Sequence, residues 1–191
     1  MAGSARYTAV LDANVLYPTL VRDVLLSLAV ADLYHARWSA SIHEEWVRNL
    51  ANNRPDIADR LPAIVEGMNS AVPDSLVTGY EPLVPSLMLP DPDDRHVLAA
   101  AIVGHADAIV TFNLDDFPQP YLAQFNIEVQ HPDRFVTHQL HLHKLKALTA
   151  IKQMRARWSR PARSAEELLQ ALHGRGLTLS ADLLKEAIDL I

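Results

Sequence analysis

The chain has 191 residues, of which 49% are hydrophobic and 21% are charged, and it contains no cysteine. One domain of ordinary size with some additional chain fits this length, and neither a disulfide framework nor a cysteine-ligated zinc site is possible. No charged-then-apolar leader pattern opens the sequence, and no apolar run approaches the roughly 18 residues of a membrane span. We therefore expect a soluble, cytoplasmic protein that does not contact a membrane.

The net charge of −6 is unevenly distributed along the chain. Residues 1–140 hold 8 arginines and 18 acidic residues, whereas residues 141–163 hold 7 basic residues and no acid. Residues 164–191 hold 2 basic and 5 acidic residues. This pattern predicts two domains, an acidic body over 1–140 and a C-terminal extension over 141–191.

Predicted strands alternate with predicted helices along the body. Short apolar, β-leaning runs favour strands, and apolar residues at a spacing of three to four favour helices. The expected strands are 7–11, 34–39, 82–90, 107–113 and 125–130, and the expected helices are 18–33, 41–50, 57–71 and 95–106. This order is typical of an α/β fold with a mostly parallel central sheet.

The C-terminal extension is predicted to be helical. Residues 138–158 have the periodicity of one helix, so we expect a basic helix over 141–160, ended by Pro161 and followed by a linker over 157–164. Ser164 and Glu167 have the spacing of a capping box that opens a short helix over 165–172. Ser180 is expected to cap a second short helix that runs to Ile191.

Acidic residues lie between the ends of predicted strands and the beginnings of the following helices. In parallel sheets, ligand-binding groups lie at this edge of the sheet. Carboxylate oxygens are hard ligands suited to Mg²⁺ or Mn²⁺, and several that converge would repel one another without a cation. Such a cation can polarise a phosphoryl oxygen and activate a water for attack. A structural interpretation is also open for each site, since Asp91-Pro92 can cap a helix, Glu44 can pair with Arg48 and Asp115 can form a turn.

Four segments in this order, VLDANVLY, SASIHEEW, DPDDRHVLAAAI and IVTFNLDDF, resemble the successive signatures of PIN-domain ribonucleases. The chain is most similar to VapC-like toxins of type II toxin–antitoxin pairs, over residues 5–137. The resemblance implies a PIN-like three-layer α/β/α fold followed by a small helical extension. It also implies an Mg²⁺- or Mn²⁺-dependent endoribonuclease that cuts RNA, such as tRNA or rRNA loops. Such an enzyme is inhibited by a cognate antitoxin protein and commonly forms a homodimer.

The same resemblance assigns roles to individual residues. Asp12, Glu45 and Asp94 correspond to the metal-binding catalytic acids, and Asp116 or Asn113 would complete the metal site. The number of metal ions, one or two, depends on which of these two residues is the ligand and stays open. Three further residues would support the ligands: Asn14, Asp91 and Thr111. His43 and His96 each lie two residues from one of these acids, so on a helix they are expected to point away from the site.

The basic segment is expected to contact RNA phosphates, and residues 164–191 to contact the antitoxin. The basic residues concerned are Lys144, Lys146, Lys152, Arg155 and Arg157. Two other functions are open at this point. One is a PIN-type nuclease in RNA processing or DNA metabolism outside a toxin system, and the other is a non-catalytic PIN-like protein that binds RNA or a partner.

Overall fold

The computed structural model describes residues 7–158 and 161–191. The chain forms two compact units: unit 1 holds Met1–Tyr17 and Tyr34–Gln130, and unit 2 holds Pro18–Leu33 and His131–Ile191. An early helix of the sequence thus belongs to the same unit as the C-terminal helices. The domain boundary at residue 140 stays a prediction.

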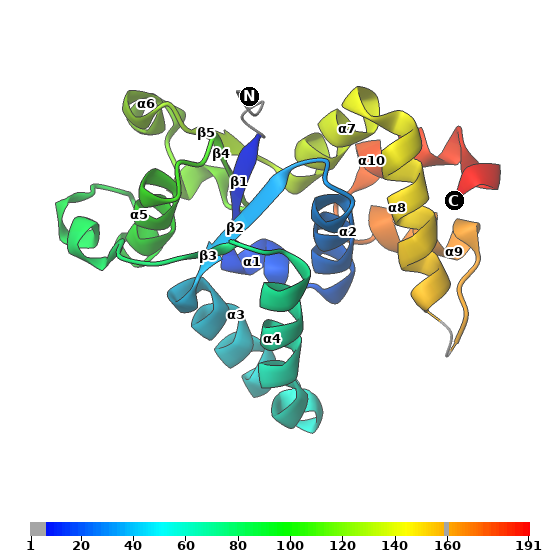
Figure 1. The fold of residues 1–191 in the computed structure, drawn as a ribbon, viewed down its shortest axis with the longest axis horizontal. Coiled ribbons are helices and arrows are strands. Elements are labelled where there is room, and N and C mark those ends of the chain that lie inside the picture. Colours follow the sequence, from blue (N-terminus) through cyan, green and yellow to red (C-terminus); the bar gives the residue numbers. More distant parts are fainter. Residues whose placement is uncertain (1–6, 159–160) are drawn as a thin grey trace. The chain divides into compact units, whose positions relative to one another are not determined.

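Unit 1 is built on a five-stranded sheet in the order β3-β2-β1-β4-β5, in which every pair is parallel (Figure 1). The central strand β1 and its neighbour β4 are buried along their whole length, as expected for a parallel sheet. This arrangement confirms the predicted α/β fold with a parallel sheet. The strands are β1 Thr8–Leu11, β2 His35–Ser39, β3 Leu76–Val77, β4 Ala108–Val110 and β5 Glu128–Gln130.

The helices of unit 1 bury apolar residues against the rest of the unit. Helix α3 begins after Ser39, whose hydroxyl accepts a hydrogen bond from the Ile42 amide, and it buries Ile42, Trp46 and Leu50. Helix α5 is buried over Val97–Ala101 and packs against β1, β2 and β4. The α-helices are α1 Ala13–Leu16, α3 Ala40–Asn53, α4 Leu61–Ala71, α5 Arg95–Val103 and α6 Gln119–Leu122.

The strand expected at 82–90 is wrong. Residues Glu81–Ser86 form a 3₁₀ helix, which contains Pro82 and Pro85. Proline has no N–H to donate to a sheet ladder, so this segment cannot pair as an inner strand. The strand that pairs with β2 is instead the two-residue β3, Leu76–Val77.

Unit 2 consists of helices (Figure 1). Helix α2 packs against α7, α8 and α9, and α10 packs against α7 and α9. None of the helices in the described part of the chain is long and apolar enough to cross a membrane. The α-helices are α2 Thr19–Val30, α7 Pro132–Leu142, α8 Lys144–Arg157, α9 Ala165–His173 and α10 Thr178–Lys185.

The single helix expected over 138–158 is wrong. His143 has φ −140° and ψ 53°, which is not helical, and it separates α7 from α8. The break lets both helices pack against α2, a contact that the local sequence does not reveal. The basic helix therefore runs over Lys144–Arg157 rather than 141–160, and part of the predicted linker, residues 159–160, lies outside the described residues.

The cap expected at Ser180 is also wrong, whereas the capping box of Ser164 and Glu167 is present. Helix α10 begins at Thr178, and Ser180 is fully buried inside it. The Asp133 carboxylate on α7 accepts hydrogen bonds from the Leu179 and Ser180 amides, each 2.8 Å, and from the Ser180 hydroxyl, 2.7 Å. Asp133 therefore caps α10 from a distant part of the sequence.

Candidate active site

Asp12 is held in place at the end of the central strand. It follows β1 and is only 3% exposed. One carboxylate oxygen accepts a hydrogen bond from the Ala13 amide (2.6 Å), so Asp12 caps α1. The other accepts one from the Thr111 hydroxyl (2.7 Å). Thr111 directly follows β4, and the pairing of β4 with β1 brings the two side chains together.

The hydroxyl of Thr111, itself a predicted supporting residue, joins Asn14 and the backbone of Asn113 to Asp12. While it donates to Asp12, its oxygen accepts hydrogen bonds from the Asn14 amide group (2.8 Å) and the Asn113 backbone N–H (3.0 Å). The Asn14 side chain also accepts a hydrogen bond from the Phe112 N–H (3.1 Å). The hydroxyl thus uses its one donor and two acceptor positions, which fixes the Asp12 carboxylate rigidly.

Five carboxylates form one electrostatic cluster, hereafter the carboxylate cluster: Asp12, Glu45, Asp91, Asp94 and Asp116. Burial, together with the negative charges of the other four members, raises the pKa of Asp94 to about 7. Burial and, to a smaller extent, the Glu45 charge outweigh the Thr111 hydrogen bond and raise the pKa of Asp12 to about 6. Such effects require short separations, so the fold gathers these acids from four different segments.

An open pocket of about 510 Å³ lies at the cluster. Its walls include Glu45 on α3, Asp94 at the start of α5, and Asn113 after β4. Asp91 also lines it, and its side chain caps the short 3₁₀ helix Pro92–Asp94. Asp12 and Asp116 are not part of the pocket wall, and Asp12 is almost completely buried.

The expectation that His96 points away from the acids is wrong. Its Nε2 lies 3.3 Å from Glu45 Oε2, and its side chain lines the pocket. The contact arises because α3 packs against α5, which the spacing within either helix could not show. His43, by contrast, makes hydrogen bonds with Trp46 (3.0 Å) and Asn69 (3.2 Å) and does not line this pocket.

The donor chemistry of the cluster fits a divalent cation. Carboxylate and carboxamide oxygens are the ligands that Mg²⁺ and Mn²⁺ prefer, and a cation would offset the repulsion that raises the pKa of Asp94. Over residues 7–158 and 161–191, however, no three His, Asp or Glu side chains are arranged as a metal-ligand group.

Three of the five basic residues predicted to contact RNA bind other parts of unit 2. Lys146 donates to the Asp32 carbonyl (3.0 Å), and Arg157 donates to the Ser27 hydroxyl (2.8 Å). Arg155 donates to the carbonyls of Arg163 (2.8 Å) and Ile191 (3.0 Å). The two remaining residues, Lys144 and Lys152, are exposed. Part of the positive charge of α8 is therefore explained by contacts that hold unit 2 together.

Comparison with known families assigns both parts of the chain. Residues 8–115 match the family described as PIN domain, which is more than half of the chain. The chain belongs to the PIN domain family. Residues 132–186 match the family described as VapC50 C-terminal domain. The predicted PIN-like fold with a C-terminal extension is thereby confirmed.

The chain is also similar to a curated protein named "Putative ribonuclease VapC50" from Mycobacterium tuberculosis (strain ATCC 25618 / H37Rv). The two are 36% identical over 108 residues, which cover 54% of this chain and 63% of that protein. The match thus spans less than two thirds of the length of this relative. No solved structure matches the chain.

The raised pKa of Asp12 predicts how stability depends on pH in the absence of divalent cations. Its folded pKa of about 6 exceeds the value near 4 of an unfolded aspartate, so the folded state binds the extra proton. The contribution of Asp12 to the free energy of unfolding should therefore fall by roughly 1–3 kcal/mol as pH rises from about 4 to about 7. Urea unfolding in EDTA at several pH values measures this fall.

Asp12→Asn isolates the contribution of Asp12 to this pH dependence, because an asparagine side chain at position 12 cannot ionise. It also loses a hydrogen-bond acceptor, so its absolute stability is not the readout; the pH dependence is. We expect a smaller fall with pH in Asp12→Asn than in wild type, and an unchanged fall in Asp59→Asn, which removes an exposed carboxylate of unit 1. The same pH dependence in all three proteins would contradict this account of Asp12.

Proposed function

We propose that this chain is a divalent-cation-dependent endoribonuclease that acts as the toxin of a toxin–antitoxin pair. The observation that carries the proposal is the carboxylate cluster, in which burial and the charges of the other members raise the pKa of Asp94 to about 7. Membership of the PIN domain family and the likeness to a protein named as a VapC ribonuclease support it.

In this proposal Asp12, Glu45 and Asp94 hold Mg²⁺ or Mn²⁺, and Asn113 or Asp116 completes the site. When bound, the cation polarises the phosphate and lowers the pKa of a water, which supplies the nucleophile. Thr111 and Asn14 keep the Asp12 oxygens in a fixed orientation through the hydrogen bonds described above. His96 lies within ion-pair distance of Glu45 (3.3 Å) and thereby limits the orientations of that side chain.

The pocket also suggests how an antitoxin would inhibit the enzyme. Five acidic residues line it, against the two basic residues Arg48 and His96. A basic side chain of an antitoxin would be attracted to this excess of negative charge and would exclude both cation and RNA. Two further parts of the proposal follow from the family resemblance. The substrate is RNA, with tRNA and rRNA loops as candidates, and the location is cytoplasmic.

Asp94→Asn should reduce RNA cleavage in Mg²⁺ by at least about 100-fold, because it removes a charged oxygen from the cation site. The measurement is cleavage of a mixed pool of structured RNAs by purified full-length protein. Asp115→Asn is the matched control, because Asp115 is exposed and lies outside the cluster although it neighbours Asp116. It should cleave RNA at the wild-type rate.

Circular dichroism and unfolding curves establish that both variants remain folded. Cleavage by Asp94→Asn at the rate of Asp115→Asn, or wild-type cleavage that persists in excess EDTA, would overturn the proposed chemistry.

Expression of the intact chain in bacteria should stop growth if the protein is a toxin, and the Asp94→Asn variant should not. Growth should return when the small open reading frame next to the gene is co-expressed. The readout is colony formation at matched protein levels. Unimpaired growth with folded, RNA-cleaving wild-type protein would instead favour a nuclease of RNA processing or DNA metabolism.

A further inference from the structure

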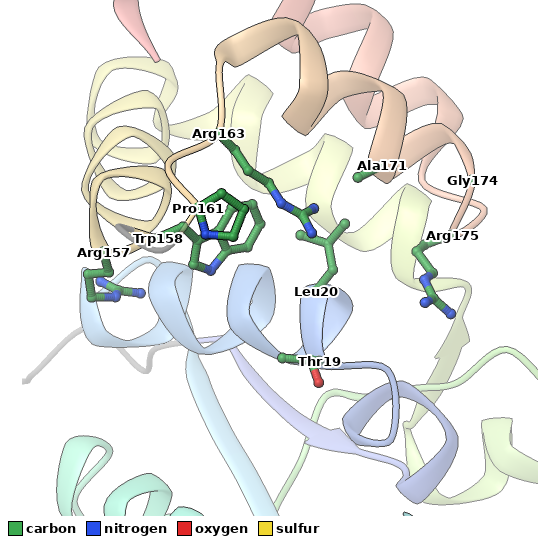
Figure 2. A pocket seen from close by; sticks show the side chains of 9 residues that line it. All are labelled: Thr19, Leu20, Arg157, Trp158, Pro161, Arg163, Ala171, Gly174 and Arg175. Carbon is green, nitrogen blue, oxygen red and sulfur yellow. The ribbon is translucent and has the colours of Figure 1, made fainter. Parts of the chain in front are cut away.

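Unit 2 contains a second pocket, which the proposed cleavage chemistry does not use (Figure 2). It has a volume of about 810 Å³. The lining comes from the beginning of α2, the end of α8 and the segments on either side of α9. Three of its lining residues are arginines, and among the described residues that line it none is acidic. The residues used in the argument are Thr19, Leu20, Arg157, Trp158, Arg163 and Arg175.

One wall of the pocket is a cation–π pair of an indole and a guanidinium. The Arg163 guanidinium carbon lies over the Trp158 ring, 4.9 Å from its centroid. Trp158 is oriented by a hydrogen bond to the Asp23 carboxylate. Arg157 next to it is anchored to the Ser27 hydroxyl. An aromatic ring and an arginine plane in this arrangement form the kind of surface on which nucleobases stack.

Two of the three arginines of the pocket, Arg163 and Arg175, carry positive charge that no ion pair in the described part of the chain neutralises, whereas Arg157 interacts with the charge of Asp23. Within residues 7–158 and 161–191, no carboxylate lies within ion-pair distance of the Arg163 or Arg175 side chain. Figure 2 shows Arg175 across the pocket from Arg157, at the turn that follows α9. A guanidinium binds phosphate oxygens through two parallel N–H groups, so Arg175 is suited to an anion.

The first turn of α2 adds to this preference for an anion. Thr19 and Leu20 line the pocket, and α2 has neither a side-chain cap nor an acidic residue in its first turn. The backbone N–H groups of a first turn have no acceptor within their own helix, and the helix dipole is positive there. This end of a 12-residue helix therefore reinforces the charge of the arginines.

We propose that this pocket binds a nucleotide, with its base stacked on Trp158 and Arg163 and its phosphate held by Arg175 and the first turn of α2. The volume of about 810 Å³ lies within the range of roughly 300–1,000 Å³ that is usual for small-molecule sites. A lone phosphate would leave most of this space empty, and an acidic peptide would not use the stacking surface. The nucleotide is either free or part of a bound RNA strand; the second case rests on the proposed ribonuclease function.

The test follows Trp158 in the full-length protein by NMR of the tryptophan indole N–H groups. The other two tryptophans, Trp38 and Trp46, are fully buried in unit 1, and Trp158→Phe identifies the Trp158 signal. AMP, adenosine and a short single-stranded oligoadenylate are titrated in EDTA, so that binding is measured without cleavage. We expect the Trp158 signal to move with AMP or with the oligonucleotide, and adenosine to bind at least about tenfold more weakly because it lacks the phosphate.

Arg175→Gln should weaken nucleotide binding at least about tenfold, since it removes the bidentate phosphate contact. Arg134→Gln is the matched control, because Arg134 is an exposed arginine of unit 2 outside the pocket, and it should leave binding unchanged. Arg163→Gln provides a second variant should Arg175→Gln fail to fold. Binding of the oligonucleotide but not of AMP would identify an RNA strand as the source, whereas comparable binding of both would identify a free nucleotide.

Three results would overturn the proposal: no change of the Trp158 signal with either nucleotide ligand, equal weakening by Arg175→Gln and Arg134→Gln, or displacement of the Trp158 signal by an oligoglutamate peptide instead of by nucleotides. Because all titrations are done in EDTA, a failure of the ribonuclease proposal leaves them unaffected. Conversely, a protein that cleaves RNA in Mg²⁺ but shows none of these shifts would refute the nucleotide pocket alone.

Discussion

The burial and mutual repulsion of carboxylates at one edge of a parallel sheet are the constraint on which the candidate site of unit 1 depends. The pairing of β1 with β4 places Asp12 beside Thr111, and the start of α5 adds Asp94. The Asp12 and Asp94 carboxyl groups have pKa values of about 6 and about 7. Their ionised forms are therefore less stable in the folded protein than those of exposed aspartates. A protein accepts such a cost where a positively charged ligand offsets it, and a divalent cation is the ligand that carboxylates favour.

Much of the fold of unit 1 could be predicted because its signals are local. Apolar runs located four of the five strands, and periodicity located α3 and α5. The strand expected at 82–90 failed on a local signal, the prolines Pro82 and Pro85, and the other failures occurred where distant residues decide the structure. Strand β3 has only two residues and exists through its pairing with β2, and the break at His143 accompanies the packing of α7 and α8 against α2. Likewise, the cap of α10 is Asp133, which lies on another helix.

The part of the candidate site that could be predicted is the part whose residues are positioned by the order of the strands. Asp12 and Thr111 follow neighbouring strands, so their meeting follows from the order of the strands. The contact of His96 with Glu45 depends instead on how α3 and α5 pack. The spacing of two residues between Asp94 and His96 had predicted that His96 points away from the acids. The arginine pocket of unit 2 combines residues more than a hundred positions apart, for which the charge imbalance of 141–163 was the only signal in the sequence.

The most direct test of the central claim is cation binding itself, measured by titrating full-length protein with Mn²⁺ and following water-proton relaxation. If the carboxylate cluster is a cation site, wild-type protein and Asp115→Asn should bind Mn²⁺ saturably, and Asp94→Asn should bind it at least about tenfold more weakly. Equal binding by Asp94→Asn, or no saturable binding by the folded wild-type protein, would contradict the account.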